Sequence, residues 1–207
     1  MPTKNIVKVY GADQYYHVYN RGVAKTNIFL DRHDYEHMLG LFKRHLLVKP
    51  TFDKERRKRP NYYNDVEVIA YCLMPNHYHL LLYLRKAEGA EKLLRSVMTA
   101  YSMYFNKRHK RVGSLFQNHF LASRISSEEY LQHVTRYIHL NPEGIGQSYD
   151  SYPYSSYAYY MGNKSAEWVH EERLVETADE RRKYADFVAE ACGQAEAEDL
   201  DDELAHP

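Results

Sequence analysis

Two apolar runs separated by a short turn constrain this chain more than any other feature of its sequence. The runs cover residues 66–73 and 77–82, and Pro75-Asn76 lies between them. Apolar runs joined by turn residues are typical of a β-hairpin. Because side chains alternate between the two faces of a sheet, His77 and His79 at the start of the second strand point to the same side. This pair favours metal or phosphate chemistry over a core role, but two imidazoles leave a metal site incomplete, so a third ligand must come from elsewhere.

The segments around the hairpin predict an α+β fold. Extended stretches and helices alternate at residues 14–20, 31–46, 66–73, 77–82, 90–106 and 120–125. The order β-α-β-β-α-β is that of a ferredoxin-like antiparallel sheet with two helices on one face. The first and third strands are central neighbours in this topology, so we expect His17 to lie beside His77 and His79.

A third helix follows the last predicted strand, and we expect it to cover the other face of the sheet. It begins at the capping pattern of residues 126–129 and ends near Leu140, before Asn141-Pro142. His133, Tyr137 and Asn141 are spaced four residues apart and share one face of this helix. We expect that face to be exposed and to bring Tyr137 and Asn141 to the histidines. Because the residue before a proline is disfavoured in the α region, we also expect Asn141 to leave helical geometry.

The net charge of zero hides an uneven distribution of charge. Residues 165–207 hold 14 Asp or Glu and 4 Lys or Arg, whereas residues 1–164 hold 24 basic and 14 acidic side chains. The two parts therefore carry formal charges of −10 and +10, and the basic body predicts a polyanionic partner, with nucleic acid the leading candidate. The 21 tyrosines include rings suited to stacking on bases, although we expect most of them to fill half-buried surface.

The basic side chains expected to contact nucleic acid fall in several short segments. The run at residues 54–59 stands before two adjacent tyrosines. Phosphate contact with base stacking and a plain solvated loop are equally open for this run. The full set of candidates is Arg21, Lys54, Arg56, Arg57, Lys58, Arg59, Lys107, Arg108 and Arg124.

The length of 207 residues predicts one domain with an appendage. We place the main domain at residues 1–165 and an acidic extension, partly helical or disordered, at residues 166–207. Cys72 and Cys192 are too few and too far apart for a disulfide framework or a metal cluster. The sequence begins without an apolar signal region and has no apolar run long enough to span a bilayer, which predicts a cytoplasmic protein.

Several motifs stand in an order that points to one family. His77-Tyr78-His79 is followed about sixty residues later by Arg136-Tyr137-Ile138-His139-Leu140-Asn141-Pro142. Together with blocks at residues 16–22, 105–108, 113–117 and 152–157, these motifs resemble the single-tyrosine HUH transposases of insertion-sequence type, in particular the REP-associated tyrosine transposases. The resemblance spans about residues 14–157 and leaves the acidic extension unexplained.

The resemblance implies metal-dependent cleavage and rejoining of single-stranded DNA next to hairpins or palindromes, through a covalent 5′-phosphotyrosine. On the matching positions Tyr137 is the nucleophile, and His77, His79 and Asn141 hold a divalent metal, Mg²⁺ or Mn²⁺. His17 and His133 are candidates for supporting these residues, and His133 and His139 for taking the tyrosine proton. The resemblance also implies a bacterial, nucleoid-associated protein, either monomeric or a homodimer.

Two other functions stay open on the sequence. A domesticated descendant would bind single-stranded DNA hairpins without cutting them, and a metal-dependent hydrolase would use water in place of Tyr137. Only the tyrosine mechanism leaves the protein covalently attached to DNA.

Overall fold

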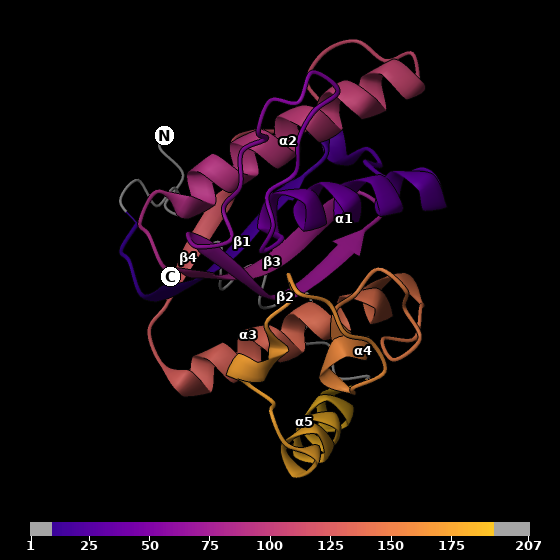
Figure 1. Ribbon diagram of the computed structural model, residues 1–207. Coiled ribbons are helices and arrows are strands. Elements are labelled where there is room, and N and C mark those ends of the chain that lie inside the picture. The colour runs from indigo at the N-terminus through magenta and orange to yellow at the C-terminus, as the bar shows by residue number, and fades with distance from the viewer. Residues whose placement is uncertain (1–9, 193–207) are drawn as a thin grey trace.

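The computed structural model describes residues 10–192 of the chain. Its main helices and strands follow the predicted order, and two further helices come after them (Figure 1). The strands are β1 (Gln14–Arg21), β2 (Val66–Met74), β3 (His77–Leu84) and β4 (Leu121–Ile125), and the helices are α1 (Arg32–Leu46), α2 (Gly89–Arg108), α3 (Glu128–Leu140), α4 (Tyr157–Tyr160) and α5 (Ala178–Ala191). Within residues 10–192, no helix has the length and apolar character needed to cross a membrane.

The four strands form one antiparallel sheet in the order β2-β3-β1-β4. β1 and β3 are neighbours in its centre, as expected. Their register places Arg21 opposite His77 and Tyr19 opposite His79. The predicted α+β fold with a ferredoxin-like succession of elements is confirmed.

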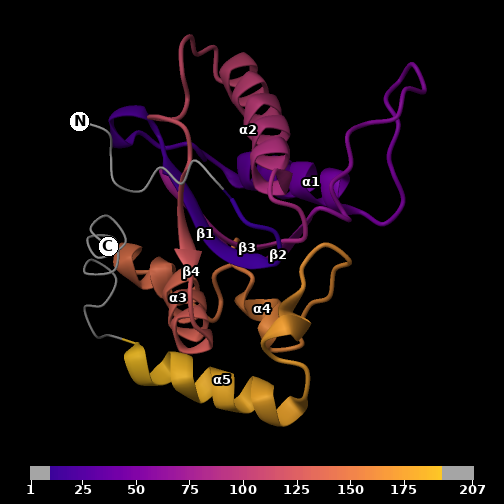
Figure 2. The same ribbon diagram turned by 90° about the vertical axis from the view of Figure 1, so that its left-hand side faces the viewer.

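Helices cover both faces of the sheet, and each face has its own hydrophobic core. α1 and α2 lie on one face, whereas α3, α4 and α5 lie on the other (Figures 1 and 2). Because strand side chains alternate, Leu80 and Leu82 of β3 enter the first core and Leu81 enters the second. The tyrosine-bearing helix α3 therefore packs on the sheet face expected for it.

The edge strand β2 is covered by residues from the C-terminal part of the chain, and all nine of its residues are buried. The Leu73 amide donates to the Tyr154 carbonyl, and the Ser156 amide donates to the Tyr71 carbonyl. Such coverage occupies backbone groups that an open edge would offer to another chain.

Residues 166–192 are built into the body of the molecule. Trp168 and Val169 belong to the first core, and Tyr184 and Val188 of this segment belong to the second. Arg173 pairs with Glu67, a buried carboxylate of β2. Residues 193–207, which hold six acidic side chains and no Lys or Arg, lie outside the described residues, and the domain boundary at residue 165 stays a prediction.

The start of α1 follows the expectation from the sequence, whereas the end of α3 does not. Asp31 caps α1 as expected, because its side chain accepts from the amides of His33 and Asp34. The expectation that Asn141 leaves helical geometry is wrong: its φ and ψ are −46° and −38°, and the chain continues as a 3-10 helix over Asn141–Ile145. Pro142 lies in the first turn of that helix, where a missing backbone donor costs little.

Candidate active site

The sheet face covered by α3 gathers the polar side chains of β1 and β3. His17, Tyr19 and Arg21 alternate along β1 with residues that enter the first core, and His77 and His79 do the same on β3. α3 contacts β3, so this row of side chains meets the tyrosine-bearing helix. The strand alternation predicted from the sequence thus sets the composition of the site.

His17 and His79 form a buried pair. Their rings are nearly parallel, with centroids 5.1 Å apart, and His17 Nε2 lies 2.9 Å from His79 Nδ1. Burial lowers the pKa of His17 to about 3 and lowers the pKa of His79 well below its ordinary value. The nearby charges of His77, His17 and Arg21 lower the pKa of His79 further. Both rings are therefore neutral at physiological pH and share one hydrogen bond.

Three buried polar atoms on this face have no hydrogen-bond partner among the described residues: His17 Nδ1, His79 Nε2 and Ser123 Oγ. A buried polar group without a partner costs roughly 1–3 kcal/mol. Native structures hold few such groups, and a bound ion or other ligand can supply the partner that the protein does not. The clustering of three on one face therefore marks it as a candidate binding site.

His77 and Asn141 bring two acceptor atoms face to face. Asn76 Nδ2 donates to the Lys25 carbonyl over 3.3 Å, which turns Asn76 Oδ1 toward His77 Nδ1 at 2.6 Å. A neutral His77 therefore donates from Nδ1 and carries its lone pair on Nε2. Asn141 Nδ2 donates to the Tyr137 carbonyl over 2.9 Å, so Asn141 Oδ1 points to His77 Nε2 at 3.3 Å. With His77 in this tautomer, Nε2 and Asn141 Oδ1 are both acceptors, an arrangement that suits a cation.

These residues fit a divalent metal. His77 Nε2, His79 Nε2 and Asn141 Oδ1 can each offer a lone pair, and the rings of His77 and His79 lie 5.0 Å apart at 89°. Within residues 10–192, no three His, Cys, Asp or Glu side chains form a group able to hold a metal. A metal at this place would therefore use the Asn141 amide oxygen as its third protein ligand.

Tyr137 stands edge-on to the histidine pair. Its ring centroid lies 5.3 Å from that of His79 and 6.0 Å from that of His17. The side chain is buried, with only 4% of the residue exposed, so the expected exposure of this helical face is wrong. α3 packs with this face against the sheet, and the packing that brings Tyr137 to the histidines also covers it.

The two histidines of α3, His133 and His139, lie away from this site. His133 Nδ1 is 3.1 Å from Arg136 Nη2, and the His133 ring contacts Phe187 of α5 edge-on. His139 is fully buried among other residues, with Nδ1 2.7 Å from Tyr184 Oη and Nε2 2.7 Å from Ser156 Oγ. The structure therefore brings His17 to the pair His77 and His79, but not His133 or His139.

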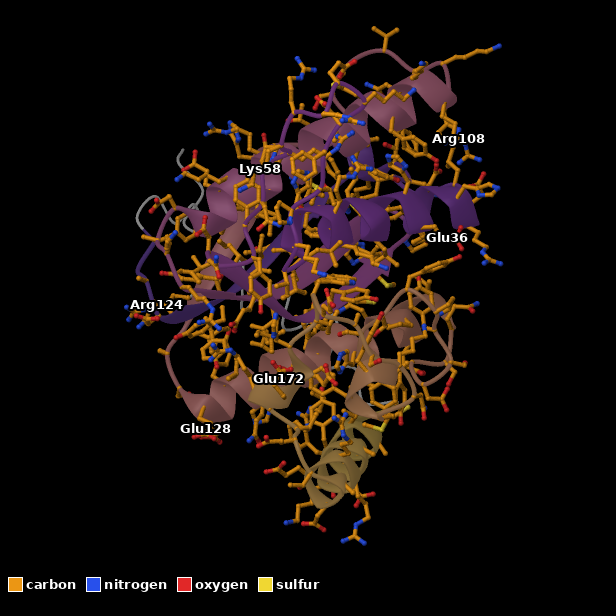
Figure 3. All side chains as sticks on the ribbon, viewed as in Figure 1. Glu36, Lys58, Arg108, Arg124, Glu128 and Glu172 are labelled. Atoms are coloured by element: carbon orange, nitrogen blue, oxygen red, sulfur yellow. The ribbon has the colours of Figure 1, made fainter. Side chains whose placement is uncertain are left out.

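The candidate DNA-binding side chains are spread over the molecule. Figure 3 shows Lys58, Arg108 and Arg124 at three separate places, and the segment between α1 and β2 that carries residues 54–59 projects from the body (Figure 2). Arg108 is paired with Asp31 and Asp34 at 2.6 and 2.5 Å. The nine candidates therefore do not form one continuous basic surface.

The remaining candidates differ in whether an acidic side chain already pairs with them. Arg57 is paired with Asp53 and Glu55 at 2.8 and 3.1 Å. Arg21 sits opposite His77 in the strand register and so lies nearest the site. The candidates that are exposed or half-buried and form no ion pair with another described residue are Lys54, Arg56, Lys58, Arg59, Lys107 and Arg124.

Two members of the site were not predicted from the sequence. Tyr19 stacks on both histidines, with its ring centroid 5.2 Å from His17 and 5.8 Å from His79. Ser123 of β4 is in register with His17 and carries one of the unpartnered oxygens. Strand alternation in the sequence could have identified Tyr19, because it is two residues from His17 on the same strand. Ser123 can be identified only when the register of β4 against β1 is known.

Two comparisons with known proteins give a match, one to a family and one to a solved structure. Residues 54–141 match the family described as IS200-like transposase. A solved structure of a REP-associated tyrosine transposase bound to a REP hairpin is similar in fold, with a TM-score of 0.54 and 15% sequence identity, over 77% of this chain and 87% of that chain. No curated protein matches the chain.

The matched segment contains both strands of the hairpin, α2, β4 and α3, and its last residue is Asn141. It therefore includes His77, His79 and Tyr137. The resemblance seen in the sequence motifs is confirmed by the match of residues 54–141 to the IS200-like transposase family and by the similar fold of a REP-associated tyrosine transposase.

Proposed function

We propose that this protein cleaves and rejoins single-stranded DNA next to hairpins, through a covalent bond between Tyr137 and a DNA 5′ phosphate. The observation that carries the proposal is that His77 Nε2 and Asn141 Oδ1 lie 3.3 Å apart on the same face of the sheet as His79 Nε2, which has no partner among the described residues. The IS200-like family match and the similar fold of a transposase bound to a REP hairpin support the choice of DNA substrate.

A metal held by His77, His79 and Asn141 would supply charge neutralisation at a phosphodiester, which is otherwise a poor electrophile. Mg²⁺ and Mn²⁺ suit an amide oxygen with water completing the coordination, and imidazole accepts Mn²⁺ readily. Burial keeps His79 neutral, so the ring can bind a metal through whichever nitrogen carries the lone pair. The Asn141 side chain is already turned to His77 by its bond to the Tyr137 carbonyl.

Tyr137 acts as the nucleophile. Its Oη forms a bond to phosphorus, the bond from phosphorus to the 3′ oxygen breaks, and the tyrosine proton ends on that oxygen. The products are a 5′-phosphotyrosine and a free 3′-OH, and attack by a second DNA 3′-OH reverses the step. The Tyr137 ring contacts histidines of its own chain, so one chain holds both the nucleophile and the ligands in this arrangement.

The covalent intermediate tests the proposal. Purified protein mixed with a single-stranded hairpin oligonucleotide and Mn²⁺ should give an adduct that survives denaturing electrophoresis. Tyr137→Phe should fold and bind the oligonucleotide but give no adduct. A persistent adduct in this variant would remove Tyr137 from the mechanism.

The burial of Tyr137, at 4% exposure, favours a second candidate function. A protein whose tyrosine stays covered would bind DNA hairpins without cutting them. Such a protein would shift the oligonucleotide in a native gel and give no adduct with any divalent metal. The same experiment therefore separates the two functions.

A further inference from the structure

His17 is fully buried next to the proposed metal ligands but is not itself one of them. Its Nε2 lies 2.9 Å from His79 Nδ1 in a hydrogen bond, and its Nδ1 has no partner among the described residues. A second imidazole behind a ligand imidazole controls which nitrogen of the ligand carries the proton.

The single hydrogen bond between the two neutral rings allows two proton arrangements. In the first, His79 Nδ1 donates to His17 Nε2, so His79 Nε2 carries a lone pair and His17 Nδ1 carries a proton. In the second, His17 Nε2 donates to His79 Nδ1, so His79 Nε2 carries a proton and cannot bind a cation. Each ring has one proton in both arrangements, and the two rings change together.

One neighbour restricts the pair. Tyr19 stacks on both rings, at 24° to His17 and 22° to His79, which holds the two imidazoles in their edge-to-edge hydrogen bond. Ser123 is the register partner of His17 on β4, but no hydrogen bond joins Ser123 Oγ to His17 Nδ1, and both atoms lack a partner among the described residues. A cation at His79 Nε2 would select the first arrangement, because only there does this nitrogen carry a lone pair.

We propose that His17 is a positioning residue whose Nε2 holds the proton of His79 on Nδ1 and so presents His79 Nε2 as a metal ligand. The proposal rests on the proposed function for the role of His79 as a ligand. In this proposal β1 contributes to metal binding through His17, which fixes the tautomer of a ligand on β3.

The first test needs no DNA. Nitrogen NMR of metal-free protein labelled at its histidines, with signals assigned from single His→Gln variants, should show the proton of His79 on Nδ1 and that of His17 also on Nδ1. A proton on His79 Nε2 would overturn the proposal.

The second test measures Mn²⁺ affinity from the electron paramagnetic resonance signal of the free ion. His17→Phe removes the acceptor and should weaken Mn²⁺ binding by about 10- to 100-fold, the range typical of losing such a supporting group. His17→Gln places an amide oxygen where Nε2 was and should stay near the wild-type affinity. His139→Phe is the matched control, because His139 is equally buried and should leave the affinity unchanged.

An unchanged affinity in His17→Phe, or an equal loss in His17→Phe and His17→Gln, would contradict the proposal. Neither readout uses DNA, so its failure is distinct from failure of the proposed function. A protein that binds Mn²⁺ in a His17-dependent way yet forms no adduct would refute the cleavage function alone.

Discussion

The two buried histidine clusters of this molecule differ in how their hydrogen bonds are completed. On the side of α3 that meets β1 and β3, His17 and His79 share one hydrogen bond and leave one nitrogen each without a partner among the described residues. His139, two residues after Tyr137 on the same helix, has a partner on each nitrogen, Tyr184 and Ser156. Burial lowers the pKa of His17 and of His139 alike, to about 3.

The difference shows that neither burial nor a shifted pKa identifies the site. Both clusters are neutral, fully buried and lined by tyrosine rings, so both look alike by those criteria. The His139 cluster is complete: Ser156 Oγ also accepts from the Tyr71 amide at 2.8 Å, and the network joins α3, α5 and β2. Buried polar atoms without a partner distinguish the candidate active site from the structural cluster.

The greatest loss should come from removing the part of the chain that completes the His139 cluster. Ending the chain at Ser165 removes Trp168, Val169 and Tyr184 from the cores and leaves Glu67 without Arg173. Loss of one buried aromatic alone costs about 3–5 kcal/mol, and a whole domain is stable by roughly 5–15 kcal/mol. We expect no cooperative unfolding transition by circular dichroism.

Ending the chain at Cys192 is the matched control, because it removes no residue of the described part. We expect that shorter protein to keep its melting temperature and to form the adduct. If the chain ending at Ser165 folds and cleaves, the acidic extension is a separate appendage, as the sequence suggested.

Tyr184→Phe separates the two clusters by deleting one hydroxyl. It leaves His139 Nδ1 without its partner in a buried place and should lower the free energy of unfolding by about 1–3 kcal/mol. Adduct formation below the melting temperature should not change, because the hydroxyl of Tyr184 bonds to His139 and not to a candidate ligand. Denaturant melts and adduct yields measured on the same sample check both statements. An unchanged stability with a lost adduct would reverse the roles assigned to the two clusters.

The Asn141 side chain has both a structural and a candidate ligand role, because its Nδ2 caps a helix carbonyl and its Oδ1 faces His77. Asn141→Ala should therefore lower stability by about 1 kcal/mol and also raise the Mn²⁺ concentration needed for half-maximal adduct formation. Asn141→Asp keeps the oxygen and should restore the metal dependence without restoring the cap. Titration of Mn²⁺ with a thermal melt for each variant checks this, and a metal dependence unchanged in Asn141→Ala would remove Asn141 from the site.

The weakest effect concerns the projecting segment, which belongs to neither cluster. Replacing Lys54, Arg56, Lys58 and Arg59 with Ser should weaken single-stranded DNA binding and reduce the slope of log affinity against log salt by about 0.7 per lost phosphate contact. Arg57 is left in place because it is paired with Asp53. An unaltered slope would make the segment a solvated loop, and the melting temperature should not change in either case.

The sequence predicted the parts of this molecule that depend on periodicity. Strand alternation put His77 and His79 on one face, and the order of elements put β1 beside β3, so that the contact of His17 with His79 followed. Helical spacing placed Tyr137 and Asn141 together on one side of α3.

Contacts between segments far apart in the sequence were not predicted. The burial of Tyr137 depends on how α3 packs on the sheet, which spacing along the helix does not specify. His139 resembles a free proton acceptor in the sequence because its partners, Tyr184 and Ser156, lie 45 and 17 residues away. The covering of β2 by residues 154–156 and 169 likewise joins elements far apart in the chain, and it makes part of the acidic extension structural.

The tyrosine mechanism is tested most sharply by locating the covalent bond among the 21 tyrosines of the chain. The adduct formed with a hairpin oligonucleotide and Mn²⁺ is digested with nuclease and protease, and the nucleotide-bearing peptide is sequenced by tandem mass spectrometry. We expect a single modified peptide that carries the nucleotide phosphate on Tyr137. A phosphate on any other tyrosine, or cleaved DNA with no modified peptide at all, would refute the mechanism.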